Sequence, residues 1–250
     1  MSTRFVACPP RDLQDFVLSV LHFRDLPRRA RDDVRIALTR IPPESQSIFL
    51  WAAEDAHLTA GTALERLAAV WFLNAAVNLA DDLADGDCDY LEPRVGPGVA
   101  FLLQALALLP LARSNLTAAC WEDCSIALTR AAAGQSLEVR GLISDAEDYL
   151  RIADAIAGQQ YAAYFRLLWD GSELETRAVR VGSLIGRVCI VLTDLDSMDG
   201  RLFRLTTPER ANILEVCRDA LVELKEHAAC TSVLRFSEFA ANTLETKHVA

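Results

Sequence analysis

A long apolar segment that ends in aspartates constrains the fold of this chain more than any other feature. Residues 63–85 contain neither glycine nor proline, and they would make about six turns if helical. Five polar side chains recur in this segment at helical spacing: Asn74, Asn78, Asp81, Asp82 and Asp85. That spacing predicts one helix with a polar stripe, and such a stripe on an apolar helix must face water or a polar cavity.

The rest of the chain favours helices as well. Its 250 residues are 52% hydrophobic and include only 11 glycines and 9 prolines, which allows a large core and few strand-like stretches. Thr62 and Thr207 have the sequence pattern of helix N-caps. We predict an all-α, single-domain bundle over residues 1–250, with about ten helices around a central cavity. The helices are expected at residues 10–23, 28–40, 44–58, 60–85, 97–113, 116–142, 145–170, 173–200, 207–229 and 231–246.

Charge and composition limit the partners and the compartment. The net charge of −10 argues against nucleic acid as a partner, because nucleic-acid binding needs a basic face. The seven cysteines lack paired spacing, which is typical of reduced thiols in the cytosol. The apolar runs 67–80 and 99–112 fall short of a membrane span, and no signal peptide is recognisable. We therefore expect a cytoplasmic protein without a membrane span.

The aspartates point to a bound cation. Asp81 and Asp85 lie one helical turn apart, so they repel each other unless a cation lies between them. A second acidic cluster, residues 194–199, ends another apolar segment. If the two helix ends faced each other, their carboxylates would form a cage for hard cations, and hard cations hold diphosphates.

Two other interpretations of the first cluster remain open. The aspartates could simply form a solvated helix end that continues into the acidic loop 86–89. Alternatively, residues 81–92 partly follow the ligand spacing of a calcium-binding EF-hand loop. Leu83 at a ligand position and Pro93 after the loop oppose the calcium interpretation.

The segment before the second cluster carries two glycines and an arginine. Gly182 and Gly186 lie one turn apart, which suggests close helix packing or room for a ligand. Arg187 lies two turns before Asp194 on the same face. It could contact a diphosphate or pair with the aspartates, and the sequence leaves both roles open.

Over most of residues 40–200 the chain resembles the trans-prenyl diphosphate synthases, within the wider class I isoprenoid synthases. Residues 81–85 match the DDxxD motif of that family, and residues 134–138 are similar to its GQxxD motif, with glutamate in place of aspartate. Residues 182–196 resemble the glycine-containing helix that carries the second aspartate motif. The resemblance implies the isoprenoid synthase fold, a prenyl diphosphate substrate, up to three Mg²⁺ ions (or Mn²⁺) and a homodimer.

The resemblance also implies roles for individual residues. Asp81, Asp82 and Asp85 would bind two metal ions, and Asp194 would bind a third together with Asp196 or Ser197. These four aspartates, Asp81, Asp82, Asp85 and Asp194, are the predicted catalytic residues. The metals would draw the diphosphate away and leave an allylic carbocation in an apolar cavity. The predicted substrate-binding residues are Asn74, Asn78, Arg94, Gln135, Glu138, Gln160 and Arg187.

Several departures from that family affect the predicted function. Chain-elongating members bind isopentenyl diphosphate in a basic pocket, but residues 42–47 contain no lysine or arginine here. Asn74 stands at the position of the family's histidine, and Gln160 stands where a lysine is usual. Arg94 is the one displaced arginine after the first aspartates. In the second motif, Arg201 replaces the final acid of the terpene cyclase pattern.

Three functions are compatible with this combination. Our preferred prediction is a Mg²⁺-dependent terpene synthase-like enzyme, which ionises an allylic prenyl diphosphate and then cyclises or quenches the carbocation. The first alternative is a trans-prenyltransferase, acting in chain elongation or on an unusual acceptor. The second alternative is a non-catalytic subunit of a prenyl diphosphate synthase.

Overall fold

The computed structural model shows an all-helical chain. It describes residues 17–19, 25–197, 201–227 and 230–247. Within these ranges there are helices and short helical turns but no strand, which confirms the predicted fold class. The expected helix 10–23 lies mostly outside the described residues. The chain divides into two compact units, residues 1–116 and 117–250.

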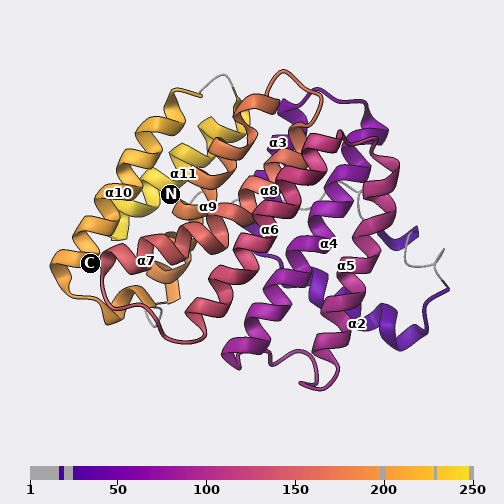
Figure 1. Ribbon diagram of the computed structural model, residues 1–250, viewed down its shortest axis with the longest axis horizontal. Helices are drawn as coiled ribbons and strands as arrows, with labels where there is room; N and C mark the ends of the chain where they lie inside the picture. Colours follow the sequence, from indigo (N-terminus) through magenta and orange to yellow (C-terminus); the bar gives the residue numbers. More distant parts are fainter. Residues whose placement is uncertain (1–16, 20–24, 198–200, 228–229, 248–250) are drawn as a thin grey trace. The chain divides into compact units, whose positions relative to one another are not determined.

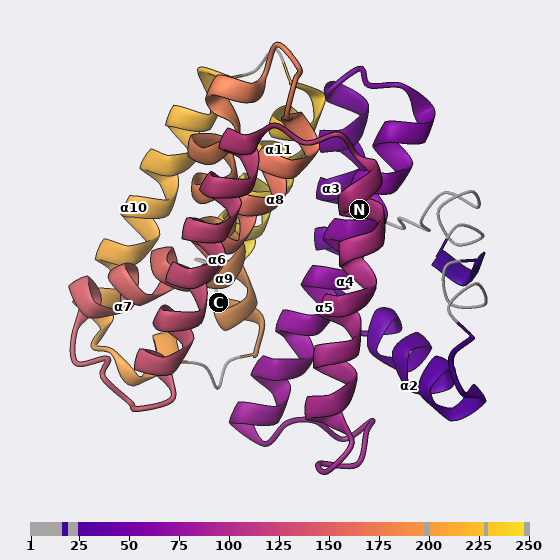
Figure 2. The same cartoon turned by 45° about the vertical axis from the view of Figure 1, so that its right-hand side comes forward.

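The first unit is built on two long helices. Its members are α2 (Arg28–Thr39), α3 (Pro43–Asp55), α4 (Ala60–Asp85) and α5 (Gly96–Arg113). α4 and α5 lie side by side, and α2 and α3 pack against α4 (Figures 1 and 2). Phe49 of α3 and Phe72 and Leu79 of α4 are fully buried, so this unit has a hydrophobic core of its own.

The predicted helix at 60–85 is confirmed with both of its ends. Its N-cap is Thr59, whose hydroxyl accepts a hydrogen bond from the Thr62 N–H at 3.3 Å. The predicted cap, Thr62, therefore lies inside the first turn. A threonine cap satisfies a backbone donor that would otherwise lack a partner at the helix start.

Both long helices would suit a membrane span by length and composition alone. The apolar runs 67–80 and 99–112 lie inside these helices, which are longer than the runs. Of the 18-residue apolar stretch in each helix, 56% is buried inside the protein in α4 and 44% in α5. The two helices pack on each other as core helices of the first unit.

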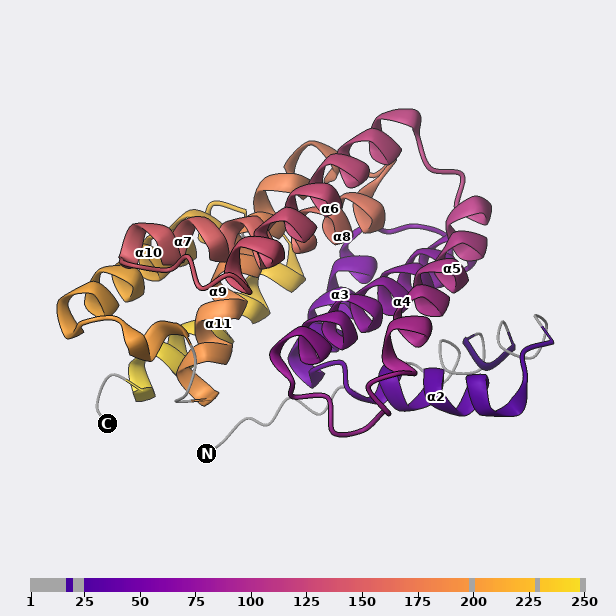
Figure 3. The same cartoon turned by 60° about the horizontal axis from the view of Figure 1, so that its bottom comes forward.

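The described residues of the second unit form six α-helices. They are α6 (Ala118–Glu138), α7 (Ala146–Ala153), α8 (Gln159–Trp169), α9 (Ala178–Ser197), α10 (Thr207–Lys225) and α11 (Thr231–Lys247). α8 packs against α6 and α9, while α10 packs against α7, α9 and α11 (Figure 3). The predicted helix 145–170 is divided into α7 and α8 by a π-helical turn, η1 (Asp154–Gly158). Such turns are rare and are often found at functional positions.

The glycines of α9 allow close backbone contact with η1 and α8. A Cβ atom added at Gly182 would lie 2.5 Å from the Tyr161 carbonyl oxygen, and one at Gly186 would overlap the Ala157 carbonyl. Any larger side chain at either position would push the helices apart. Of the two interpretations of these glycines, the structure therefore supports close packing.

A buried arginine ties α6, α8 and the segment after α8 together. The guanidinium of Arg166 donates hydrogen bonds of 2.8–2.9 Å to three carboxylates: Asp123, Asp170 and Glu175. Asp170 also accepts hydrogen bonds from the hydroxyl and the N–H of Thr117, just before α6. Since Arg166 and Asp170 are both almost inaccessible to water, each charge depends on the other for stabilisation.

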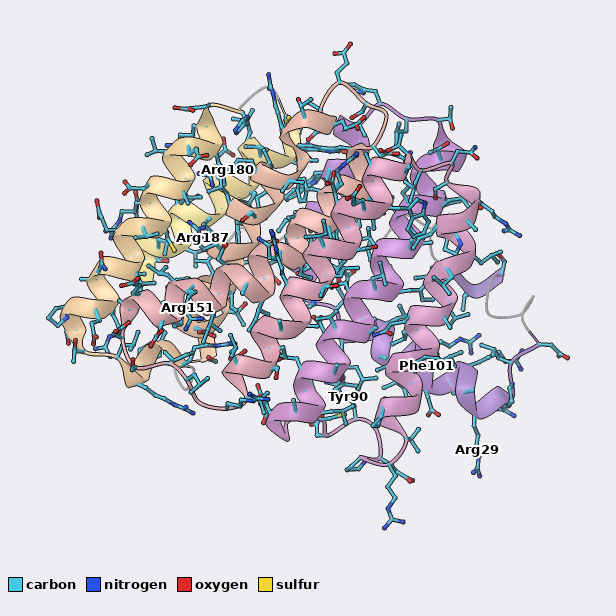
Figure 4. The ribbon with its side chains drawn as sticks, in the orientation of Figure 1. Arg29, Tyr90, Phe101, Arg151, Arg180 and Arg187 are labelled. Carbon is cyan, nitrogen blue, oxygen red and sulfur yellow. The ribbon has the colours of Figure 1, made fainter. Side chains whose placement is uncertain are left out.

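We expect Arg166→Met to destabilise the folded protein by about 3–5 kcal/mol, because it leaves the buried Asp170 carboxylate without its guanidinium. Urea denaturation followed by circular dichroism would measure this loss. The matched control is Arg180→Met (Figure 4), which breaks the more exposed ion pair with Glu223 and should change stability by less than about 1 kcal/mol. Equal losses in the two variants would contradict the structural role of Arg166.

The same network predicts a pH dependence. Burial alone would raise the pKa of Asp170, but the hydrogen bonds from Thr117 and Arg166 lower it overall. A lowered pKa in the folded state stabilises the protein above the ordinary aspartate pKa of about 3.9, and this stabilisation is lost as the pH falls below it. Asp170→Asn should therefore reduce the slope of unfolding free energy against pH below about pH 4. An unchanged slope would show that Asp170 does not contribute to acid unfolding.

Candidate functional site

The first acidic cluster lies at the C-terminal end of α4. The helix ends there because Gly86 adopts a left-handed conformation with φ of 80°, which is favourable only for glycine. The N–H groups of Gly86, Asp87 and Cys88 are all directed at the Asp82 carbonyl oxygen. A helix C-terminus carries partial negative charge, so this end of α4 attracts cations even before its carboxylates are counted.

The three aspartates differ in their surroundings. Asp81 and Asp82 are half-buried, whereas Asp85 is exposed. The Tyr90 hydroxyl donates a hydrogen bond of 2.6 Å to Asp82 Oδ2 (Tyr90 is labelled in Figure 4). Burial, and then the contact with Asp82, raises the pKa of Tyr90, so its hydroxyl stays protonated and holds the Asp82 carboxylate in one orientation.

The loop after α4 is also tied to α2. The Arg40 guanidinium lies over the Tyr90 ring, 4.5 Å from its centre, and pairs with Asp89 at 3.7 Å. Arg40 follows the last residue of α2. Arg40 therefore supports Tyr90, which orients Asp82. Arg40 itself lies at the edge of the first acidic cluster and not within it.

The donor set at the end of α4 fits Mg²⁺. Asp81, Asp82 and Asp85 offer carboxylate oxygens that are at least partly accessible to solvent, and Mg²⁺ prefers such oxygen ligands. In the part of the chain that the structure describes, no three acidic, histidine or cysteine side chains gather closely enough to enclose an ion. A Mg²⁺ ion held at this helix end would combine one or two of these carboxylates with waters or substrate phosphates.

The other predicted residues of the first unit lie along α4 and after it. Asn74 is buried and Asn78 is half-buried. They continue the stripe of the aspartates toward the middle of the helix. Arg94 is exposed in the segment between α4 and α5. Their predicted roles in binding substrate remain predictions.

The second acidic cluster is organised differently from the first. Asp194 is buried on α9, with 3% of its surface exposed. Its Oδ2 atom accepts a hydrogen bond from the Tyr149 hydroxyl at 2.9 Å and pairs with Arg201 Nε at 3.1 Å. The same guanidinium pairs with Glu138 at the end of α6. We call these four residues, Glu138, Tyr149, Asp194 and Arg201, the Arg201 cluster.

The Arg201 cluster does not fit a metal ion at Asp194. Burial, and then Asp194 itself, raises the pKa of Tyr149 well above its usual value, so this hydroxyl remains a hydrogen-bond donor. Asp194 Oδ2 is thus already shared between a phenol and a guanidinium. A divalent cation bound by that oxygen would have to displace Arg201 from a largely buried position. The contacts of Asp194 therefore disagree with the expected third Mg²⁺ at this carboxylate.

The neighbouring predicted ligands are more accessible. Asp196 and Ser197 are exposed at the end of α9, and the Ser197 hydroxyl donates to the Asp194 carbonyl oxygen at 3.2 Å. Asp199, which belongs to the same acidic run, lies outside the described residues. Gln135 is half-buried one turn before Glu138 on α6.

Arg187 and Gln160 make local contacts in the second unit. Arg187 Nη2 donates to Asp154 Oδ1 at 2.8 Å, and the Ser183 hydroxyl donates to the same oxygen at 3.0 Å. The observed partner of Arg187 (Figure 4) is thus an aspartate of the π-helical turn, outside the two clusters. Gln160 is buried and donates to the Tyr164 hydroxyl at 3.0 Å.

The residues that orient the carboxylates are not evident from the sequence. Tyr90 and Tyr149 each donate to a predicted metal ligand, and Asp154 pairs with Arg187. Arg201 was recognised as replacing an acid, but its pairing with Asp194 was not predicted. An arginine at a ligand position of an acidic motif indicates that the chain itself supplies the positive charge that neutralises the carboxylates.

Comparison with known proteins shows the isoprenoid synthase fold. A geranyltranstransferase from Thermotoga maritima matches with a TM-score of 0.73 and 16% identity, over 94% of this chain and 97% of the other. A geranyltransferase from Legionella pneumophila matches with a TM-score of 0.66 and 17% identity, over 95% and 94% of the two chains. A decaprenyl diphosphate synthase from Rhodobacter capsulatus matches with a TM-score of 0.62 and 14% identity, over 94% and 88%. Neither a sequence-family profile nor a curated protein matches the chain.

We expect Asp85→Asn to stabilise the metal-free protein by about 0.3–1 kcal/mol, because it removes both a like-charge contact one turn from Asp81 and a negative charge at a helix C-terminus. Chemical denaturation in EDTA would measure the gain, and added Mg²⁺ should reduce it. The control is Asp87→Asn, which makes the same charge change beyond the helix and should have a smaller effect. A loss of stability in Asp85→Asn without metal would contradict mutual repulsion between the carboxylates.

Proposed function

We propose that this protein is a Mg²⁺-dependent trans-prenyltransferase, which ionises an allylic prenyl diphosphate and transfers the prenyl group to an acceptor. The observation that carries the proposal is the row of oxygen ligands at the end of α4, on a fold shared with solved geranyltransferases and a decaprenyl diphosphate synthase. In the proposed reaction the allylic C–O bond breaks and the diphosphate leaves with the electron pair. The acceptor then supplies electrons to the carbocation, and a proton is lost.

The residues of α4 account for the ionisation step. Asp81, Asp82 and Asp85 would hold Mg²⁺ on the diphosphate oxygens, where the metal neutralises the charge that develops on the leaving group. Tyr90 would keep Asp82 oriented through its hydrogen bond. The chain itself carries a net charge of −10, so an anionic substrate depends on added positive charge for binding.

The first turn of α3 argues against isopentenyl diphosphate as the acceptor. That turn contains no lysine or arginine, and two polar side chains at this end of the helix donate to nearby backbone carbonyls. Gln46 donates to the Ile41 carbonyl at 2.7 Å, and Ser47 donates to the Pro43 carbonyl at 2.9 Å. A second diphosphate needs charged donors. This favours a second candidate function, a terpene synthase-like enzyme that cyclises or quenches the carbocation within one substrate.

We further propose that residues 1–250 act as one catalytic domain, in a cytoplasmic homodimer. None of the described cysteines forms a disulfide, which is usual in a reducing compartment. α5 exposes Phe101 (Figure 4) and Leu108, two turns apart, with 73% and 60% of their surfaces accessible. An apolar stripe of this kind is a suitable surface for a second copy of the chain.

The proposed function is tested by incubation with geranyl, farnesyl or geranylgeranyl diphosphate and Mg²⁺, with and without isopentenyl diphosphate. We expect diphosphate release that requires Mg²⁺, and mass spectrometry would identify the organic product. Asp81→Asn should lower turnover by about 100-fold or more, since it removes a ligand of the metal that stabilises the leaving group. Asp87→Asn, outside the proposed ligand set, should retain activity.

The products distinguish the candidate functions. A longer prenyl diphosphate formed only with isopentenyl diphosphate would support chain elongation. A cyclic hydrocarbon or an alcohol formed without it would support the second candidate. The absence of diphosphate release from all three substrates would contradict both and would favour a non-catalytic subunit.

A further inference from the structure

The end of α9 has the charges of a cation site, and the chain already supplies the cation. Glu138 comes from the end of α6 and Asp194 from α9, and both carboxylates pair with the Arg201 guanidinium. The three side chains are largely buried, with 13%, 4% and 18% of their surfaces exposed. Two carboxylates from different helices thus converge on one positive charge inside the second unit.

The surroundings hold this arrangement in place. Tyr149 of α7 donates to the same Asp194 oxygen that receives Arg201 Nε, at 2.9 Å and 3.1 Å respectively. Arg201 begins the short helical turn η3 (Arg201–Arg204), and the next residue, Leu202, is fully buried. Burial of Leu202 anchors the backbone that presents the guanidinium. Displacement of Arg201 would therefore disturb packing as well as the ion pairs.

A divalent ion would have to compete with this internal cation. Metal binding through Asp194 Oδ2 requires this oxygen to exchange a guanidinium and a phenol for the metal, which takes one of its two carboxylate partners from Arg201 in a poorly hydrated position. A buried charge that loses its partner is strongly destabilising. The end of α4 presents no comparable obstacle at Asp85, which is exposed to solvent.

We propose that Arg201 stands in for a divalent cation in the second acidic cluster, so that Mg²⁺ binds at the aspartates of α4 and Asp194 is not a metal ligand. The inference deepens the proposed function, because it assigns the charge at the end of α9 to the chain instead of to a metal. It concerns metal occupancy, so it is tested without turnover.

Two tyrosines provide matched reporters of the two clusters. The chain has four tyrosines; Tyr90 donates to Asp82, and Tyr149 donates to Asp194. The experiment labels the tyrosine rings with ¹³C and adds MgCl₂, with and without inorganic diphosphate, to the full-length wild-type protein. Tyr90→Phe and Tyr149→Phe variants assign the two NMR signals. We expect the Tyr90 signal to shift with Mg²⁺ and the Tyr149 signal to stay in place.

Substitutions of Arg201 provide the second arm. Arg201→Gln keeps a hydrogen-bonding side chain but removes the cation, so Glu138 and Asp194 should then take up a metal ion and the Tyr149 signal should become sensitive to Mg²⁺. Arg201→Lys restores a positive charge and should return the wild-type pattern. Circular dichroism identifies any variant that does not fold. If Arg201→Gln does not fold, the Mg²⁺ titration of the wild-type protein alone decides whether Arg201 replaces the metal.

Each result separates this inference from the proposed function. A Tyr149 signal that shifts together with that of Tyr90 in the wild-type protein would overturn the replacement of the metal by Arg201 and would leave the site on α4 intact. A folded Arg201→Gln variant whose Tyr149 signal ignores Mg²⁺ would also overturn the replacement. If neither wild-type signal shifts, both the inference and the metal site of the proposed function are wrong.

Discussion

The second unit depends on pairing carboxylates, two of them buried, with arginines of the same unit. Arg166 joins α6 to the end of α8, and Arg187 joins α9 to the π-helical turn. Arg201 joins α6 to α9. Charges withdrawn from water are stable only with partners of good geometry, so these pairs restrict how the helices can be arranged. The positions of the buried Asp170 and Asp194 follow from this requirement.

Close backbone contact positions the polar groups of α9 and the π-helical turn η1. Gly182 and Gly186 let α9 lie directly against the Tyr161 and Ala157 carbonyl groups. Ser183, between them in sequence, reaches Asp154 of the π-helical turn, and Arg187 reaches the same carboxylate. The extra residue of a π-helical turn changes the direction of the following side chains. Because Gly182 and Gly186 have no side chains, α9 and η1 pack closely enough for their polar groups to form hydrogen bonds.

Local signals made much of the fold predictable. The absence of breakers in 63–85 and the glycine at 86 predict α4, and the structure confirms both ends of the helix. The segment 173–200 was predicted as one helix, but α9 begins only at Ala178, after the short helical turn η2 (Glu175–Arg177). Glu175 is held there by Arg166 and by the Gly171 N–H. A tertiary contact therefore decides this boundary, and helical periodicity carries no information about it.

The candidate site likewise has one part that the sequence predicts and another that it does not. The stripe from Asn74 to Asp85 follows from spacing along one helix, so the sequence predicts it. The partners of Asp82 and Asp194 come from other segments: Tyr90 lies beyond the end of α4, and Tyr149 lies on α7. No periodic pattern relates such residues to the carboxylates that they contact. For this reason the sequence predicts where acids gather, but it does not predict which of them the chain neutralises itself.

The two acidic clusters represent two solutions to one electrostatic problem. At the end of α4, like charges one turn apart and the helix C-terminus favour an ion taken from solution, so the occupancy there depends on the concentration of Mg²⁺. At the end of α9, a guanidinium in the same chain fills the need permanently, and its fixed geometry replaces the adjustable ligand shell of a metal. An arginine cannot depart with a released diphosphate, whereas a metal ion can. A protein with one exchangeable and one permanent cation would therefore respond less steeply to Mg²⁺ than one that must load both positions from solution.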